Sequence, residues 1–155
     1  KYCGSKDVIM NILYVCTGNT CRSPMAEGIT RALANEQGLD VNVFSAGLFA
    51  AYGAKPTEQA VIAIQSIADI SGHESRPLTM DLVNKADLII GMTQDYKSVL
   101  LRQFPFEEYK IKTLADWGHG AGDVVDPFGS DQVVYNQCAE QIYNLVKAGL
   151  ASSKE

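Results

Sequence analysis

The sequence lacks basic runs, long apolar stretches and export signals, and each absence narrows the classes of protein that fit. Lys and Arg number 13 against 18 Asp and Glu, giving a net charge of -5, so nucleic acid is disfavoured as the main partner. No segment reaches the roughly 18 apolar residues of a membrane span. No basic stretch followed by an apolar one marks a secretion signal. We therefore predict no nucleic-acid partner and no membrane partner.

Cysteine is too sparse for a disulfide framework in a chain of this length. The four cysteines are Cys3, Cys16, Cys21 and Cys138, a pattern that favours a reducing cytoplasmic location over secretion. Neither the two histidines nor the cysteines have the spacing of a zinc site, so we predict no metal and no other cofactor.

Length and composition indicate one folded domain. The chain has 155 residues, of which 46% are hydrophobic and 20% charged, which fits one core and not a disordered chain. No repeat, linker or low-complexity segment divides it. Met10 opens the first apolar run, so we assign a single domain to residues 10–150. We interpret residues 1–9 as a cloning remnant or an N-terminal extension.

Strand-like and helix-like segments alternate along the chain. Short apolar runs predict strands at residues 11–16, 41–45, 87–92 and 109–114. Helical spacing predicts helices at residues 23–37, 57–67, 79–85, 94–104 and 130–149. In the last helix we expect Val133 and Val134 to face the core. The alternation predicts an α/β fold with a parallel sheet and helices on both faces, in which ligands bind beyond the carboxyl ends of the strands.

The loop after the first predicted strand combines a nucleophile with a cation. Cys16 is followed six residues later by Arg22, a spacing that is weak support until its context is added. Gly18 and Asn19 tolerate positive φ, so the loop can turn successive N–H groups inward at the positive end of the following helix. Such a nest binds an anion.

Each polar residue of this loop then has a role in phosphoryl transfer without a metal. The thiolate of Cys16 attacks phosphorus, and the planar fork of Arg22 holds two phosphoryl oxygens. Ser23 donates a hydrogen bond to the sulfur, which stabilises the thiolate before attack and on leaving. The alternative is that Cys16 is a buried thiol at a strand end and Arg22 a surface residue of the helix.

The segment from Cys16 to Glu27 resembles the signature loop and first helix of the low-molecular-weight protein phosphatase family. Further similarity lies in residues 45–47, 70–73, 86–89 and 126–129, and the resemblance runs from about residue 10 to residue 149. It implies a four-stranded parallel sheet flanked by helices, of the flavodoxin-like or Rossmann-like kind. It also implies an enzyme, expected to be a monomer in the bacterial cytoplasm, that acts on phosphorylated proteins and releases inorganic phosphate. The implied phosphate-binding loop is made of Thr17, Gly18, Asn19, Thr20, Cys21 and Ser23, between catalytic Cys16 and Arg22.

The resemblance implies that Asp126 is the general acid and later the base that activates water. The leaving group needs a proton donor, and a carboxylate on a loop can supply one. Pro127 restricts the backbone of Asp126 to an extended shape. The alternative is a plain turn residue, and Asp123 is a weaker candidate for the acid on the same loop.

The family also implies a supporting network in which Ser45 and His73 hold Asn19 in an unusual backbone geometry. The alternative for His73 is a surface residue at a helix end. Cys21 is a candidate for a reversible disulfide with Cys16 that protects the nucleophile from oxidation. The alternative for Cys21 is a small side chain packed under the loop.

Thr20 is the residue that most affects the expected substrate. Family members that act on phosphotyrosine usually have Ile there, whereas Thr resembles the bacterial protein arginine phosphatases. A hydroxyl at this place would suit an attacking water or a polar guanidinium better than Ile. Phe128 and Phe49 are expected to form pocket walls, and Asp126 is expected to pair with the substrate guanidinium.

We therefore expect a protein arginine phosphatase that works through a cysteinyl-phosphate, with a tyrosine phosphatase as the alternative. An arsenate reductase on the same scaffold is disfavoured, because residues 76–95 contain no further cysteine to carry electrons away. A phosphate-binding module without turnover is disfavoured because Cys16, Arg22, Ser23 and Asp126 occur together.

Overall fold

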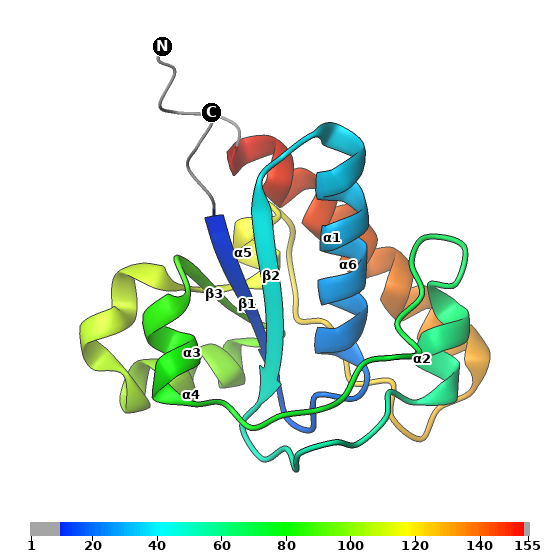
Figure 1. The fold of residues 1–155 in the computed structure, drawn as a ribbon, viewed down its shortest axis with the longest axis horizontal. Helices are drawn as coiled ribbons and strands as arrows, with labels where there is room; N and C mark the ends of the chain where they lie inside the picture. The colour runs from blue at the N-terminus through cyan, green and yellow to red at the C-terminus, as the bar shows by residue number, and fades with distance from the viewer. Residues whose placement is uncertain (1–9, 154–155) are drawn as a thin grey trace.

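The computed structural model describes residues 10–153, and its centre is one parallel sheet. The strands are β1 (Met10–Cys16), β2 (Val41–Gly47), β3 (Leu88–Gly91) and β4 (Ile111–Thr113), in the order β2-β1-β3-β4. β1 pairs with β2 on one side and with β3 on the other. The carboxyl ends of β1 and β2 point to the lower edge in Figure 1.

Helices cover both faces of the sheet. They are α1 (Arg22–Gln37), α2 (Glu58–Ala63), α3 (Met80–Lys85), α4 (Gln94–Gln103), α5 (Leu114–Trp117) and α6 (Gln132–Ser153), with a 3-10 helix η2 (Pro105–Lys110) after α4. In the view of Figure 1, α1, α2 and α6 lie to the right of the sheet and α3 and α4 to the left. Among residues 10–153, none of the helices is both apolar enough and long enough to span a membrane.

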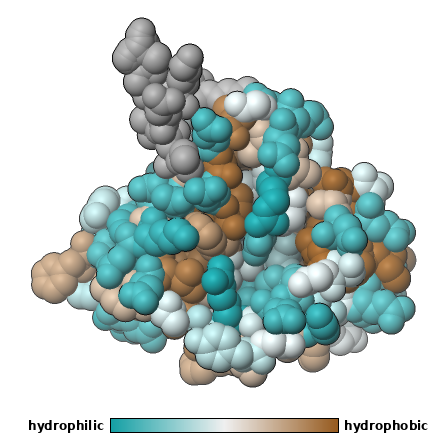
Figure 2. Space-filling model, in the orientation of Figure 1, coloured by the Kyte–Doolittle hydropathy of each residue, from teal (hydrophilic) through white to brown (hydrophobic). Residues whose placement is uncertain are grey.

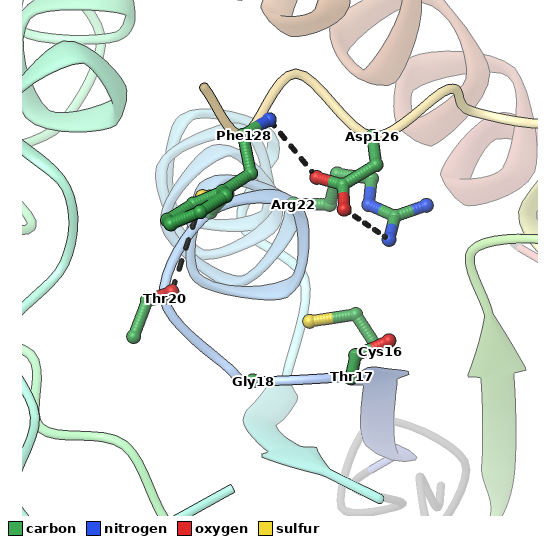
Figure 3. A pocket seen from close by; sticks show the side chains of 8 residues that line it. Cys16, Thr17, Gly18, Thr20, Arg22, Asp126 and Phe128 are labelled. Carbon is green, nitrogen blue, oxygen red and sulfur yellow. Dashed lines mark hydrogen bonds and ion pairs between the residues drawn. The ribbon is translucent and has the colours of Figure 1, made fainter. Parts of the chain in front are cut away.

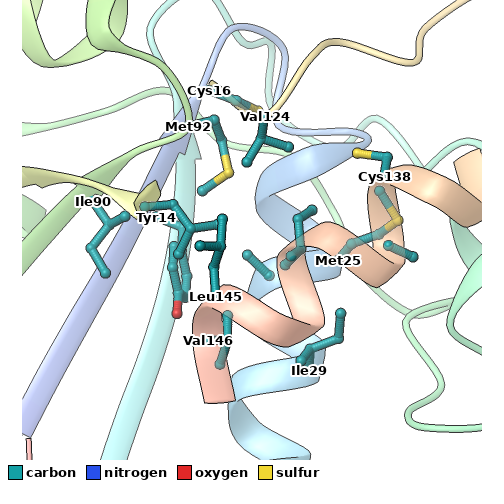
Figure 4. Packing of buried hydrophobic residues seen from close by; sticks show 14 of the residues in the cluster. Tyr14, Cys16, Met25, Ile29, Ile90, Met92, Val124, Cys138, Leu145 and Val146 are labelled. Carbon is teal, nitrogen blue, oxygen red and sulfur yellow. The ribbon is translucent and has the colours of Figure 1, made fainter. Parts of the chain in front are cut away.

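Alternation along β1 divides the core into two clusters, because successive side chains of a strand point to opposite faces. Ile12 and Tyr14 belong to the larger cluster with α1 and α6, which Figure 4 shows in part. Leu13 and Val15 belong to the smaller cluster, which also contains residues of α3 and α4. All four side chains are fully buried. On the face in Figure 2, hydrophilic residues cover much of the surface, and hydrophobic ones show in the centre and at the left and right edges.

The predicted α/β architecture is confirmed, with four parallel strands at the predicted places. Thr79 caps α3, since its hydroxyl accepts from Leu82 N at 3.3 Å. The second helix ends at Ala63 and not at residue 67, because the chain leaves helical geometry at Ile64. The sequence did not predict η2 or α5. The interpretation of residues 1–9 lies outside the described part of the chain.

The prediction that Val133 and Val134 face the core is wrong. Their exposed fractions are 60% and 37%. The buried stripe of α6 begins one residue later and continues at helical spacing through Tyr135, Cys138, Ala139, Ile142, Leu145, Val146, Gly149 and Leu150. The first turn of α6 therefore lies beyond the edge of the core.

The packing of α6 on α5 gives a stability prediction. A Cβ at Gly149 would overlap the buried ring of Trp117, so we expect Gly149→Ala to lower the free energy of unfolding by about 1–2 kcal/mol despite the better helix propensity of Ala. Urea unfolding measures this. Gly72→Ala is the control, because a Cβ there meets open space. If both variants were as stable as the wild type, the prediction would be wrong, and α5 would have to move aside without loss of stability.

Candidate active site

The loop between β1 and α1 has its carbonyl groups turned outward. Leu48 N and Phe49 N donate to the carbonyls of Cys16 and Thr17 at 2.9 and 3.0 Å, and Thr57 N donates to Thr20 O at 3.0 Å. These bonds fix the loop against the segment that follows β2. No side chain caps the start of α1, so the first amides of this helix remain available to an anion.

Asn19 is the one residue of the loop in the left-handed region, with φ of 58°, and it is fully buried. His73 Nε2 lies 2.8 Å from its carbonyl oxygen, and Arg76 N donates to its Oδ1 at 3.0 Å. Its amide Nδ2 donates to Ser45 Oγ at 2.9 Å, and Ser45 donates in turn to a Glu27 carboxylate oxygen at 2.6 Å. The structure thus brings together Asn19, Ser45 and His73 as predicted.

The direction of the hydrogen bonds in this network determines what Ser23 does. Asn19 Nδ2 also donates to Ser23 Oγ at 2.9 Å. Ser23 Oγ lies 2.8 Å from Cys16 Sγ. Because the Ser23 oxygen already accepts from Asn19, its proton is free to point at the sulfur. A hydroxyl that donates to sulfur stabilises the thiolate, the nucleophilic form of cysteine.

Arg22 is 4% exposed and is held from two sides. Its Nη1 donates to Val124 O at 2.8 Å, and its Nη2 donates to Tyr96 Oη at 2.8 Å. Nη2 also lies 3.7 Å from a carboxylate oxygen of Asp126. A guanidinium has five N–H donors, so three remain after these two hydrogen bonds. They suffice for a fork on an oxyanion beside Cys16.

A cavity of about 230 Å³ joins this loop to the segment before α6. It is lined by Cys16, Thr17, Gly18, Thr20, Cys21, Arg22, Asp126 and Phe128. Figure 3 shows Cys16 below Arg22 and Asp126, with the Phe128 ring at one side. The prediction that Phe49 forms a wall of this cavity is wrong. Its side chain is turned to solvent and is 85% exposed.

Asp123 and Asp126, the two candidate acids on the loop before α6, are placed differently. Asp123 Oδ1 accepts from Gln94 N at 2.8 Å and so braces the start of α4. Asp126 lines the cavity with a side chain that is 53% exposed, and its Oδ1 accepts from Phe128 N at 3.1 Å. Of the two candidates, only Asp126 therefore has the position that a proton donor needs.

Cys21 lines the cavity, and its sulfur also contacts α6 and the residue before α2. Its sulfur lies 3.4 Å from Tyr135 Oη and 3.6 Å from Thr57 Oγ1. Burial, with a contribution from the hydrogen bond to Cys21, raises the pKa of Tyr135 to about 12. Cys16 and Cys21 are both free thiols. A disulfide between them stays a prediction, and the observed contacts are those of a side chain packed beneath the loop.

Four hydrogen-bond partners of Asn19, Ser45 and Arg22 were missed from the sequence. Glu27 and Tyr96 act through contacts that only the fold creates, and both are far in sequence from the groups they bind. Val124 contributes a backbone carbonyl and Arg76 a backbone amide. Every residue except proline has both groups, so the residue type gave no signal. Of these, only Glu27 lay within the signature segment, where nothing in the sequence gave it a role.

The match to known proteins covers this site and the fold around it. Residues 11–155 match the family model described as low molecular weight phosphotyrosine protein phosphatase. The chain belongs to this family.

The chain resembles family members that are named for different activities. A protein-arginine-phosphatase of Bacillus subtilis (strain 168) is 42% identical over 139 residues, which cover 89% of this chain and 93% of the relative. A low molecular weight protein-tyrosine-phosphatase of Acinetobacter johnsonii is 32% identical over 137 residues, or 88% and 92% of the two chains. A solved structure of a YwlE arginine phosphatase mutant with a phosphorylated active-site serine superposes with a TM-score of 0.90. It is 39% identical and covers 94% of this chain and 97% of the other.

Proposed function

We propose that this phosphatase hydrolyses phosphoarginine in proteins through a cysteinyl-phosphate on Cys16. The observation that carries the substrate class is Thr20, which lines the cavity together with Phe128 and puts a hydroxyl where phosphotyrosine enzymes of the family usually have Ile. The 42% identity to a protein named protein-arginine-phosphatase supports the same class. Sparse cysteines support a cytoplasmic enzyme, and the acidic net charge argues against nucleic acid as its substrate.

In the first step the Cys16 thiolate attacks phosphorus, so that an S–P bond forms as the P–N bond of phosphoarginine breaks. The free donors of Arg22 and the loop amides hold the equatorial oxygens, where charge is spread in the transition state. Asp126 gives its proton to the departing nitrogen, and the product arginine leaves as a guanidinium.

In the second step Asp126 acts as a base. It takes a proton from a water molecule, the water oxygen attacks phosphorus, and the S–P bond breaks to release inorganic phosphate and the Cys16 thiolate. The hydrogen bond from Ser23, 2.8 Å from the sulfur, stabilises the same thiolate as it leaves. Both steps use the cavity that Arg22 and Asp126 line, where Arg22 Nη2 lies 3.7 Å from a carboxylate oxygen of Asp126.

A tyrosine phosphatase is the second candidate, and Phe128 favours it. The ring is 69% exposed at the cavity, where an aromatic substrate could stack against it. The cavity itself therefore accepts either a planar guanidinium or a phenyl ring, and Thr20 is the residue expected to decide between them.

The selectivity of Thr20 is testable with matched phosphoarginine and phosphotyrosine peptides. We expect the wild type to favour phosphoarginine in kcat/KM, and Thr20→Ile to shift the ratio toward phosphotyrosine by about tenfold or more, the size expected of one polar contact exchanged for bulk. Thr20→Val removes only the hydroxyl at constant shape and separates polarity from volume. A wild-type kcat/KM for phosphotyrosine equal to or above that for phosphoarginine would reject the proposed substrate.

A further inference from the structure

Tyr96 reaches the phosphate loop from α4, an element that carries no residue of the signature loop. Its hydroxyl oxygen accepts from Arg22 Nη2 at 2.8 Å and is hydrogen-bonded to Thr17 Oγ1. The Arg22 Cζ lies 5.2 Å from the centre of the Tyr96 ring, within the range of a cation–π contact. One side chain therefore touches both the residue after the nucleophile and the arginine near the end of the loop.

The donors in this arrangement are determined by the groups involved. A guanidinium only donates, so the Tyr96 oxygen is the acceptor in the bond to Arg22. The Tyr96 proton is then available to Thr17. A phenol is well suited to this position, because it joins one donor and one acceptor at a single oxygen and stands on a rigid ring.

The backbone at the start of α4 is braced so that Tyr96 has one position. The Thr93 hydroxyl accepts from Tyr96 N at 3.3 Å, and Asp123 Oδ1 accepts from Gln94 N at 2.8 Å. Gly91 makes room for the tyrosine, since a Cβ there would lie 3.1 Å from the Tyr96 Cβ. The end of β3, the Thr93 cap of α4 and Asp123 on the loop before α6 thus all support the Tyr96 side chain.

Tyr96 and Val124 together fix the plane of the Arg22 guanidinium. If Tyr96 lost its hydroxyl, Val124 O would be the one hydrogen-bond acceptor left to the Arg22 guanidinium among the described residues, and the Asp126 carboxylate, 3.7 Å from Nη2, would compete for the freed donor. We infer that Tyr96 is a positioning residue, which holds Arg22 and Thr17 in the geometry that binds an oxyanion beside Cys16. This inference rests on the proposed function only in assigning that oxyanion to a phosphoryl group.

Tyr96→Phe tests the inference, because it removes the hydroxyl and keeps the ring. We expect the affinity for inorganic phosphate, measured by titration calorimetry, to fall about tenfold, the loss typical of one hydrogen bond to a charged group. We expect kcat for an aryl phosphate to fall by a similar factor, while Tm changes by no more than about 3 °C. Tyr109→Phe is the control, since Tyr109 is 78% exposed and should bind phosphate as the wild type does.

A double-mutant cycle with Arg22→Lys shows whether Tyr96 acts through Arg22. Lysine lacks the planar fork, so in that background Tyr96→Phe should cost about twofold at most, the share carried by Thr17. Unchanged phosphate affinity in Tyr96→Phe, or a full tenfold loss in the Arg22→Lys background, would overturn the inference.

The phosphate titration needs no turnover, so the two proposals fail in different ways. If the wild type binds phosphate but hydrolyses no phosphopeptide, the proposed function fails and the inference about Tyr96 stands on its own result. If phosphopeptides are hydrolysed and Tyr96→Phe binds phosphate normally, only the inference fails. A wild type that binds no phosphate would overturn both.

Discussion

Cys16→Ser is expected to abolish hydrolysis of every phosphorylated substrate, with a fall in kcat of at least about 10⁴-fold. A serine hydroxyl does not ionise near neutral pH, and without an adjacent base it is a poor nucleophile. The side chain is 3% exposed and has one hydrogen-bond partner, Ser23, at 2.8 Å, so the exchange of sulfur for oxygen leaves the loop intact. Stopped-flow or discontinuous phosphate release measures the loss, and calorimetry should still detect phosphate binding.

Cys138→Ala is the matched control for this variant. Cys138 is also a buried thiol, and burial raises its pKa to about 12, so it stays protonated and unreactive at neutral pH. We expect it to retain near wild-type kcat. If Cys16→Ser kept more than about one hundredth of the wild-type rate, the nucleophile would have to be another group.

The difference between these two cysteines shows what the sequence revealed and what it did not. Cys16 was predicted as the nucleophile because a strand, a glycine-containing loop, Arg22 and a helix start follow one another along a short segment. Such a site is local, and its residues come from one piece of chain. The four strands were found for a similar reason, because each is a short apolar run that lies between turn residues.

The contacts that were missed depend on tertiary structure. Tyr96 lies in a predicted helix, but nothing in the sequence indicates that the first turn of this helix meets Arg22. Val133 and Val134 have helical apolar spacing, yet they lie beyond the point where α6 reaches the core and are exposed. Periodicity gives the face of a helix and not the place where its neighbours end.

The sequence favoured Asp126 as the acid through its resemblance to the family, but Asp123 stayed a weaker candidate because both lie on one loop before α6. Their hydrogen bonds separate them, since Asp123 is used by the α4 backbone and Asp126 is directed toward Arg22. Each has a matched asparagine variant that keeps its structural bond. Asn retains an acceptor oxygen for Gln94 N at position 123 and for Phe128 N at position 126, but cannot give or take a proton as a carboxyl does.

Asp126→Asn is therefore expected to lower kcat for phosphoarginine peptides by about 10²–10³-fold, within the range of general acid–base catalysis. The departing guanidine nitrogen is strongly basic and needs a proton as the P–N bond breaks, so the first step depends on the acid. With an aryl phosphate, whose phenol leaves more easily, the first step should survive and the second should slow for lack of a base. Phosphocysteine should then accumulate, and quenching followed by mass spectrometry of the peptide with Cys16 detects it.

Asp123→Asn is the control, and we expect it to retain near wild-type kcat on both substrates and to accumulate no phosphocysteine. The comparison depends on the proton alone, because both variants keep the loop bonds of 2.8 and 3.1 Å that shape the segment. A rate for Asp126→Asn within tenfold of wild type on phosphoarginine would exclude it as the acid. An equal loss in Asp123→Asn would mean that the shape of the loop, and not the carboxyl at its tip, controls the chemistry.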